Sequence, residues 1–209
     1  MVRDNSMIFG VGTGRCGTKS LAVQLGGMHE PEPWLREEPA RYKCDRDNYY
    51  RESLLEHLRT RSELPVPIVV DLKHSYVIDL ICEVDPDATF VWIRDPVDCI
   101  SSFINGGAWT RTDWHGSRNW RPFGGWPKEI SREMRVVGYW IEVNKMIENS
   151  LLKSERDYRL VKTESLTVRE NVYARKFRIE GELLELVENT CRPHYDQWIE
   201  CHWNGKGPE

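Results

Sequence analysis

The stretch from Gly10 to Leu25 places glycines, cations and hydroxyls close together, directly after three apolar residues. Glycines let the backbone curl so that successive N–H groups point at one anion, and the start of the following helix adds a favourable dipole. The side chains that supply charge or hydrogen-bond donors are Arg15, Thr18, Lys19 and Ser20. This pattern predicts a phosphate-binding loop between a strand and a helix, in preference to an ordinary glycine-rich turn.

The loop differs from the nucleotide-hydrolysis motif G-x-x-x-x-G-K-[ST] in the position of its lysine. Gly12 and Gly17 have the separation of that motif, but the lysine comes two places after the second glycine, at Lys19. Asp71 and Asp95 each follow an apolar strand, where a carboxylate could hold Mg²⁺. A small P-loop kinase or NTPase therefore remains a second interpretation.

A second polar cluster lies in the segment FVWIRDPVDCISSF. Arg94 ends its apolar strand, and Ser102 lies about two turns into the following helix. An arginine fork and a hydroxyl together could bind a second anion. The alternative is that Arg94 pairs with a neighbouring carboxylate, Asp95 or Asp98.

Together the two clusters resemble the sulfotransferases that use 3'-phosphoadenosine-5'-phosphosulfate (PAPS) and release 3',5'-ADP (PAP). The first motif of that family, [KR]-x-G-T-[TK]-x-L, is matched from Arg15 to Leu21, and the resemblance covers the chain from Met7 to about Leu166. It implies that no metal is needed and that the 3'-phosphate is held by Arg94 and Ser102. It also implies a 5'-phosphosulfate site formed by Gly14, Arg15, Cys16, Gly17, Thr18, Lys19 and Ser20.

The resemblance further implies catalytic roles for four residues. Arg15 and Lys19 would stabilise the charge that develops on the transferred group and the leaving phosphate. Asp71 or His74, in the segment VVDLKHSY, would take the proton of the acceptor. Asp71 follows the strand directly, whereas histidine has the better-matched usual pKa, about 6.5. Alternatively, Asp71 is a cap or an ion-pair partner of Lys73, and His74 is a surface loop residue.

Three features depart from the family pattern. The family's loop lysine falls on Arg15, a bulkier and always charged group. Thr163 stands where some relatives carry an aromatic residue that stacks on adenine. The glycine- and lysine-rich loop that closes over the cofactor in some relatives is absent, and Arg175 with Lys176 is our expectation for a substitute. A non-catalytic PAPS- or PAP-binding module is therefore a third interpretation.

The segment from Gly106 to Pro127 is long, irregular and rich in tryptophan and arginine. A loop of this length inside a compact domain is often a binding lid, and such side chains suit a sugar, an aromatic or an anionic acceptor. The alternative is that the tryptophans pack back onto the sheet. The residues expected to contact the acceptor are Trp109, Trp114, Arg118 and Trp120.

Strands alternate with helices along the chain, and each strand is continuously apolar. This arrangement predicts an α/β fold of three layers, a P-loop-like parallel sheet flanked by helices, in one domain spanning residues 1–209 with a lid-like insert at about 106–127. The expected strands are 6–10, 68–70, 89–93 and 159–162, and the expected helices 18–26, 50–61, 75–84, 96–104 and 128–152. Ligands bind at the carboxyl ends of such strands, where the polar clusters fall.

Composition limits the function classes. The formal net charge of −4 argues against nucleic-acid binding, and the sequence has no apolar run long enough for a membrane span. Six scattered cysteines favour free thiols in the cytoplasm, although Cys191 and Cys201 are close enough in sequence to pair. We therefore expect a cytoplasmic sulfotransferase that acts on a hydroxyl or amine of a carbohydrate or small molecule; a homodimer is compatible with the sequence.

Overall fold

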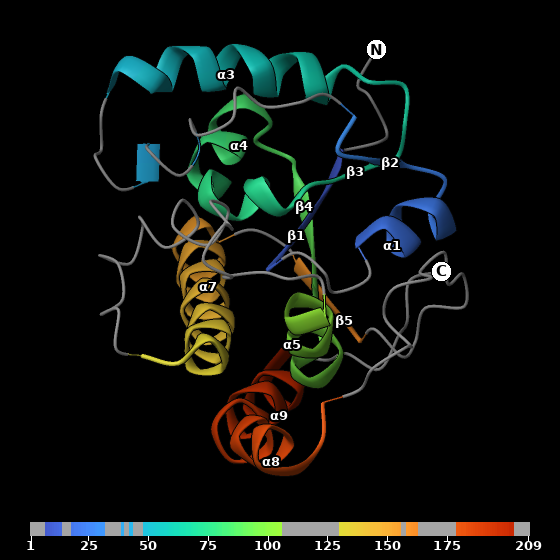
Figure 1. Cartoon of the computed structure of the whole chain (residues 1–209). Helices are drawn as coiled ribbons and strands as arrows, with labels where there is room; N and C mark the ends of the chain where they lie inside the picture. The colour runs from blue at the N-terminus through green and yellow to red at the C-terminus, as the bar shows by residue number, and fades with distance from the viewer. Residues whose placement is uncertain are drawn as a thin grey trace.

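The structure is a computed structural model, and it describes residues 7–13, 18–31, 39, 42–43, 48–105, 130–155, 158–162 and 179–202. Its centre is a parallel five-stranded sheet with the strand order β2-β3-β1-β4-β5. The strands are β1 (Ile8–Gly12), β2 (Met28–His29), β3 (Ile68–Val70), β4 (Thr89–Arg94) and β5 (Tyr158–Lys162). Helices cover both faces of the sheet, so the expected three-layer α/β architecture is confirmed (Figure 1).

A glycine in the central strand leaves room for a side chain of the neighbouring strand. Gly10 of β1 pairs with Val70 of β3, and a Cβ atom on Gly10 would lie 2.6 Å from Cγ1 of Val70. On its other side β1 pairs with β4, with Gly12 opposite Ile93. The carboxyl ends of β3, β1 and β4 therefore lie next to one another at one edge of the sheet.

The connecting helices lie on opposite faces because the connections between strands run in opposite directions along the sheet. Helix α1 (Thr18–Gln24) leads to β2 on one side of β1, whereas α4 (Ile78–Val84) and α7 (Arg132–Ser154) lead to strands on the other side. Right-handed crossovers then place α1 on one face and α4 and α7 on the other. Figure 1 shows this separation, with α1 on the right of the strands and α7 on the left.

Helix α7 packs on the sheet through aromatic residues and one buried amide. Trp140 is fully buried, and so is Trp92 of β4. The indole N–H of Trp92 donates to Oδ1 of Asn144 at 2.9 Å, and the amide of Asn144 donates to the carbonyl of Trp140 at 2.7 Å. These bonds satisfy the indole N–H of Trp92 and the side-chain amide of Asn144, and they hold α7 against β4.

The remaining described helices are α3 (Asn48–Ser62), the 3-10 helix η1 (Leu72–Tyr76), α5 (Pro96–Asn105), α8 (Gly181–Thr190) and α9 (Arg192–His202). Helix α3 packs on α4, and α8 packs on both α5 and α9. Helix α5 begins as the proline predicts, with Asp95 as its cap: Oδ1 of Asp95 accepts from the backbone N–H of Asp98 at 2.8 Å.

Three elements at the carboxyl edge of the sheet or beside it differ from the sequence-based expectation. The first strand runs two residues further, to Gly12, which carries it to the start of the glycine loop. The helix expected over residues 75–84 is divided at Val77, whose φ of −131° is not helical, into η1 and α4. Strand β2 was not expected, because two residues are too few to show a strand periodicity.

Two expectations about the chain as a whole can be compared with the described residues. Among those residues, no helix is both long and apolar enough to cross a bilayer. Cys191 is a buried free thiol, and burial raises its pKa to about 12. The pairing of Cys191 with Cys201 is therefore not present in this structure.

Candidate functional site

The end of β1 is held in place by side chains from three different elements. The hydroxyl of Ser75 in η1 accepts from the backbone N–H of Gly12 at 3.0 Å and donates to its carbonyl at 2.9 Å. The hydroxyl of Tyr139 in α7 donates to the carbonyl of Thr13 at 3.1 Å. Cys99 of α5 places its sulfur 3.0 Å from Oγ1 of Thr13. The segment that enters the glycine loop is therefore anchored by η1, α7 and α5.

The loop itself is only partly described. Gly14, Arg15, Cys16 and Gly17 lie outside the described residues, so their predicted contacts with a 5'-phosphosulfate remain predictions. The next three residues form the first turn of α1: Thr18 and Ser20 are buried, whereas Lys19 is exposed.

The second predicted anion site lies beside the first, at the end of β4. Arg94 is the last residue of that strand, and its side chain lies outside the described residues. Ser102 is buried in α5, and the described part of the chain offers its hydroxyl no hydrogen bond. The carboxylate of Asp95, one alternative partner of Arg94, is used to cap α5.

The neighbour of Ser102 connects α5 to a distant part of the chain. The hydroxyl of Ser101 accepts from the backbone N–H of Ile179 at 3.2 Å. Ile179 directly follows the undescribed residues 163–178, which include Thr163, Arg175 and Lys176. Ile179, which follows Lys176 by three residues, therefore lies against α5 at the residue that precedes Ser102.

Asp71, one of the two predicted proton acceptors, is buried and held by two partners. It caps η1, because its Oδ1 accepts from the backbone N–H of Lys73 at 2.9 Å. Its Oδ2 accepts from Nη1 of Arg61 at 2.9 Å, and both side chains are only 1% exposed. Asp71 is therefore a helix cap, as the alternative interpretation of the sequence proposed. Its ion-pair partner is Arg61 of α3.

His74, the other predicted proton acceptor, is also fully buried. Its Nδ1 lies 3.2 Å from the carbonyl of Gly10, and its Nε2 lies 3.0 Å from Nη1 of Arg61. A carbonyl only accepts and a guanidinium only donates, so Nδ1 carries the proton and Nε2 accepts. Burial, as the largest cause, lowers the pKa of His74 to about 4, so the ring is neutral at pH 7. The alternative of a surface loop residue is wrong.

We call Arg61, Asp71 and His74 the Arg61 cluster. The sequence interpretation missed its centre, Arg61, whose Nε also donates to Nε2 of His57 at 2.8 Å. A signal was present, because Arg61 follows Leu58 by three residues and so continues the buried stripe of α3. The cluster ties α3 and η1 to the end of β1, and the roles predicted for Asp71 and His74 in proton transfer stay predictions.

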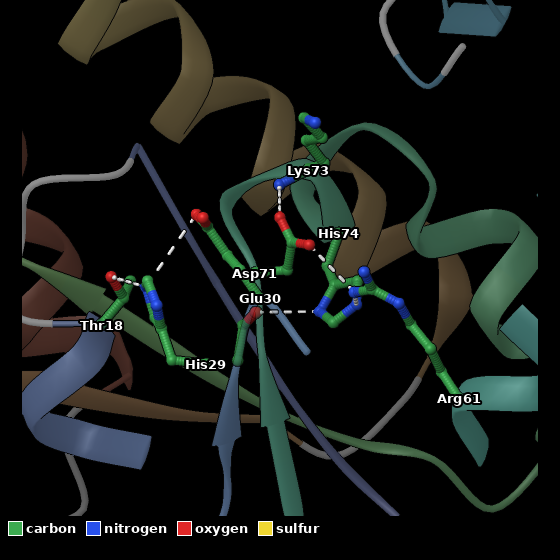
Figure 2. A network of polar contacts seen from close by, with 8 residues as sticks. Thr18, His29, Glu30, Arg61, Asp71, Lys73 and His74 are labelled. Carbon is green, nitrogen blue, oxygen red and sulfur yellow. Dashed lines mark hydrogen bonds and ion pairs between the residues drawn. The ribbon is translucent and has the colours of Figure 1, made fainter. Parts of the chain in front are cut away.

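A second polar cluster lies at the edge of the sheet; it joins Thr18, a predicted 5'-site residue, to two residues for which the sequence predicted no function. His29 ends β2, and its Nε2 lies 3.0 Å from Oγ1 of Thr18 and 3.9 Å from Oε1 of Glu30. Glu30 follows directly, with a φ of 46° in the left-handed region. We call Thr18, His29 and Glu30 the edge-strand cluster; Figure 2 shows it together with the Arg61 cluster.

The tryptophan-rich insert lies outside the described residues, together with its predicted acceptor contacts, Trp109, Trp114, Arg118 and Trp120. Its two flanks are described and lie close together. Arg132, the first residue of α7, donates from Nη2 to the carbonyl of Ile104 in the last turn of α5 at 2.5 Å. The chain therefore leaves and re-enters the described fold at neighbouring points.

The donor set at the sheet edge suits an anion. Thr18, Lys19, Ser20 and Ser102 offer hydroxyl or ammonium groups at the carboxyl edge, as a phosphate or sulfate ligand requires. Among the described residues, no group of three or more His, Cys, Asp or Glu side chains is arranged to hold a metal ion.

Comparisons with known proteins identify no family for this chain. No protein-family model matches the chain, and a search of curated proteins finds no match either.

Proposed function

We propose that this chain is a PAPS-dependent sulfotransferase that acts on a hydroxyl or amine of a carbohydrate or small-molecule acceptor. When bound, PAPS supplies an activated sulfuryl group. The residues proposed to hold its 5' end are Gly14–Ser20, and Arg94 with Ser102 would hold the 3'-phosphate. Arg15 and Lys19 supply positive charge where negative charge develops.

One observation carries the proposal: β1 and β4 are adjacent parallel strands. The glycine loop follows β1 and the Arg94–Ser102 segment follows β4, so both predicted anion sites meet at one edge of the sheet. A ligand with two separate anionic groups fits this pairing better than a ligand with one. PAPS has that character, with a 5'-phosphosulfate and a 3'-phosphate.

The second candidate, a small kinase or NTPase, fits the contacts less well. It would use Asp71 or Asp95 to hold Mg²⁺. Asp71 instead caps η1 and pairs with Arg61, and Asp95 caps α5. Both carboxylates already have partners within the protein, which favours the sulfotransferase over the NTPase.

The deciding experiment measures thermal stabilisation by PAP, by 5'-AMP and by ATP with Mg²⁺. A ligand that binds the folded state raises its free energy of unfolding, by about 2.7 kcal/mol at a hundred times its Kd. We expect PAP to raise Tm well above the other two nucleotides. Stabilisation by ATP with Mg²⁺ but not by PAP would instead support the NTPase.

A pair of neighbouring serines tests the 3'-phosphate site. Ser102→Ala should remove most of the preference for PAP over 5'-AMP, because Ser102 is proposed to bind the phosphate that 5'-AMP lacks. Ser101→Ala is the matched control, since Ser101 is equally buried but bonds to the backbone of Ile179. An unchanged preference in Ser102→Ala would refute this assignment.

Turnover separates the enzyme from a non-catalytic binding module. PAP release from PAPS is measured with a panel of phenolic, alkyl and sugar hydroxyls, with water always present as the minimal acceptor. Tight PAP binding without PAP release from any of them would identify a binding module.

A further inference from the structure

The edge-strand cluster adjoins the residue that directly follows the predicted 5' loop. Thr18 directly follows Gly17, the last loop glycine, and His29 contacts Thr18 across the gap between α1 and β2. Helix α1 packs on both β2 and β3, so this contact belongs to the packed face of the sheet. His29 is therefore tied to the predicted binding loop by a single hydrogen bond.

The surroundings of His29 differ from those of a structural histidine. Its side chain is 26% exposed, and that of Glu30 is 49% exposed, so solvent and ligands reach both. Both recorded contacts involve Nε2: the hydroxyl of Thr18 at 3.0 Å and the carboxylate of Glu30 at 3.9 Å. Within the described part of the chain, Nδ1 makes no hydrogen bond.

These contacts select one form of the neutral ring. The carboxylate of Glu30 only accepts, so a proton on Nε2 interacts favourably with it and can be donated to Oγ1 of Thr18. The lone pair then lies on Nδ1. Thr18 keeps its own hydroxyl hydrogen for donation toward an anion in the loop.

Resting on the proposed function, we propose that Nδ1 of His29 is the proton acceptor for the acceptor hydroxyl, with Thr18 and Glu30 as its positioning residues. The alternative acceptors, Asp71 and His74, each have one polar side-chain atom bonded to Arg61 and the other bonded to the backbone, at Lys73 and Gly10 respectively. His29 is the partly exposed imidazole of the described residues at this edge.

The proton balance is simple. Nδ1 of His29 takes the hydroxyl proton as the acceptor oxygen forms its bond to sulfur, and the bond between sulfur and the phosphate oxygen breaks with its electron pair going to phosphate. No oxidant or reductant is involved. Nε2–H, held by Thr18 and Glu30, keeps the ring oriented while Nδ1 becomes charged.

The first test reads the ring itself and needs no turnover. Imidazole ¹⁵N NMR, assigned with His29→Gln, reports which nitrogen carries the proton. We expect the Nε2–H form for His29 and the opposite Nδ1–H form for His74, and we expect PAP to shift the His29 signals while leaving those of His74 nearly unchanged. An Nδ1–H form for His29 would overturn the proposal.

The second test uses PAP release from PAPS with the hydroxyl panel and water. His29→Gln places an amide near the position of Nε2, so it can retain the bond to Thr18 but cannot accept a proton. We expect turnover to fall about a hundredfold or more, with PAP affinity changed less than threefold. Equal turnover in His29→Gln and wild type would overturn the proposal and leave the sulfotransferase intact.

Chemical rescue separates proton transfer from a structural role. In His29→Gly, added imidazole should restore a measurable share of the lost turnover, and it should not raise the rate of the wild type. Loss without rescue would mean that His29 only supports the loop, which overturns the proposal. PAP release by neither wild type nor variants would refute the transferase and this inference together, whereas the PAP thermal shift reports on binding separately.

Discussion

The two histidine-containing clusters at the carboxyl edge of the sheet differ in burial and in how many ring nitrogens have a partner. In the Arg61 cluster, His74 has a partner on each nitrogen and is fully buried. In the edge-strand cluster, the described residues hold His29 through Nε2 alone, and its side chain is partly exposed. Each ring contacts a residue close in sequence to the undescribed part of the glycine loop, His74 at Gly10 and His29 at Thr18, so proximity does not distinguish them. A histidine with a partner on both ring nitrogens supports the fold, whereas a histidine with a partner on one nitrogen can also react.

The largest expected effect comes from removing the centre of the Arg61 cluster. Arg61→Met leaves the Asp71 carboxylate buried without its ion-pair partner, which should cost about 3 to 5 kcal/mol of unfolding free energy. Urea unfolding at pH 7 measures this loss.

Arg59→Met is the matched control, because Arg59 lies on the same helix but is exposed. It should change stability by less than about 0.5 kcal/mol. If Arg61→Met were as stable as this control, the Arg61 cluster would not be a structural unit, and the contrast with the edge-strand cluster would fail.

The second effect is the pH dependence that His74 gives to stability. Its pKa is about 4 in the folded protein and about 6.5 in the unfolded chain. As pH falls through this window the unfolded state binds a proton that the folded state does not, so stability is lost between about pH 6.5 and 4. The full contribution is on the order of 3 kcal/mol.

Urea unfolding at several pH values in this window tests the slope. His74→Gln should be less stable at pH 7, because it loses the imidazole that bonds to both Arg61 and Gly10. Its stability should fall less steeply as the pH is lowered. The same slope in wild type and variant would show that His74 is not the group that resists protonation, contrary to its complete burial.

The sequence predicted the sheet well because a buried parallel strand needs apolar residues on both faces. Ile68–Val70 was predicted to the residue, and Thr89–Ile93 was one residue short, since both strands are continuous apolar runs between breakers. Thr18 was correctly placed as the first residue of α1. Each of these elements is predicted by residues that lie within it or directly beside it in the sequence.

The sites were harder to predict because their partners come from separate elements. Asp71 and His74 were identified, but their shared partner Arg61 lies on another helix, and only its place on the stripe of α3 indicated burial. Nothing in the sequence indicated His29, because a two-residue strand has no periodicity, and its pairing with β3 joins residues far apart in the chain. Burial of a polar residue is decided by tertiary packing, which local patterns do not contain.

The third effect tests the bond that joins the edge-strand cluster to the loop. Thr18→Val keeps the shape of the side chain but removes the hydroxyl that contacts His29. If this hydroxyl also donates to the anion, PAP affinity should fall about tenfold or more, as for hydrogen bonds to charged groups. Calorimetric titration with PAP measures the change.

Thr60→Val is the control for the same substitution on a helix far from the glycine loop in sequence, where Thr60 bonds to the carbonyl of Glu56. It should leave PAP affinity unchanged. An equal affinity in Thr18→Val and Thr60→Val would remove Thr18 from the proposed phosphate site and weaken the link between His29 and the loop.

The smallest effect concerns the backbone of Glu30, whose φ of 46° is unfavourable for residues with a Cβ atom. Its N–H donates to the carbonyl of Val70 at 3.0 Å, which holds the turn against β3. Glu30→Gly removes the strain but adds chain entropy to the unfolded state, so these terms partly cancel. Compared with Glu30→Gln, which also lacks the charge, Glu30→Gly should be more stable by a few tenths to about 1 kcal/mol. A less stable glycine variant would mean that the left-handed turn at Glu30 stores no backbone strain, and that the edge strand holds His29 without it.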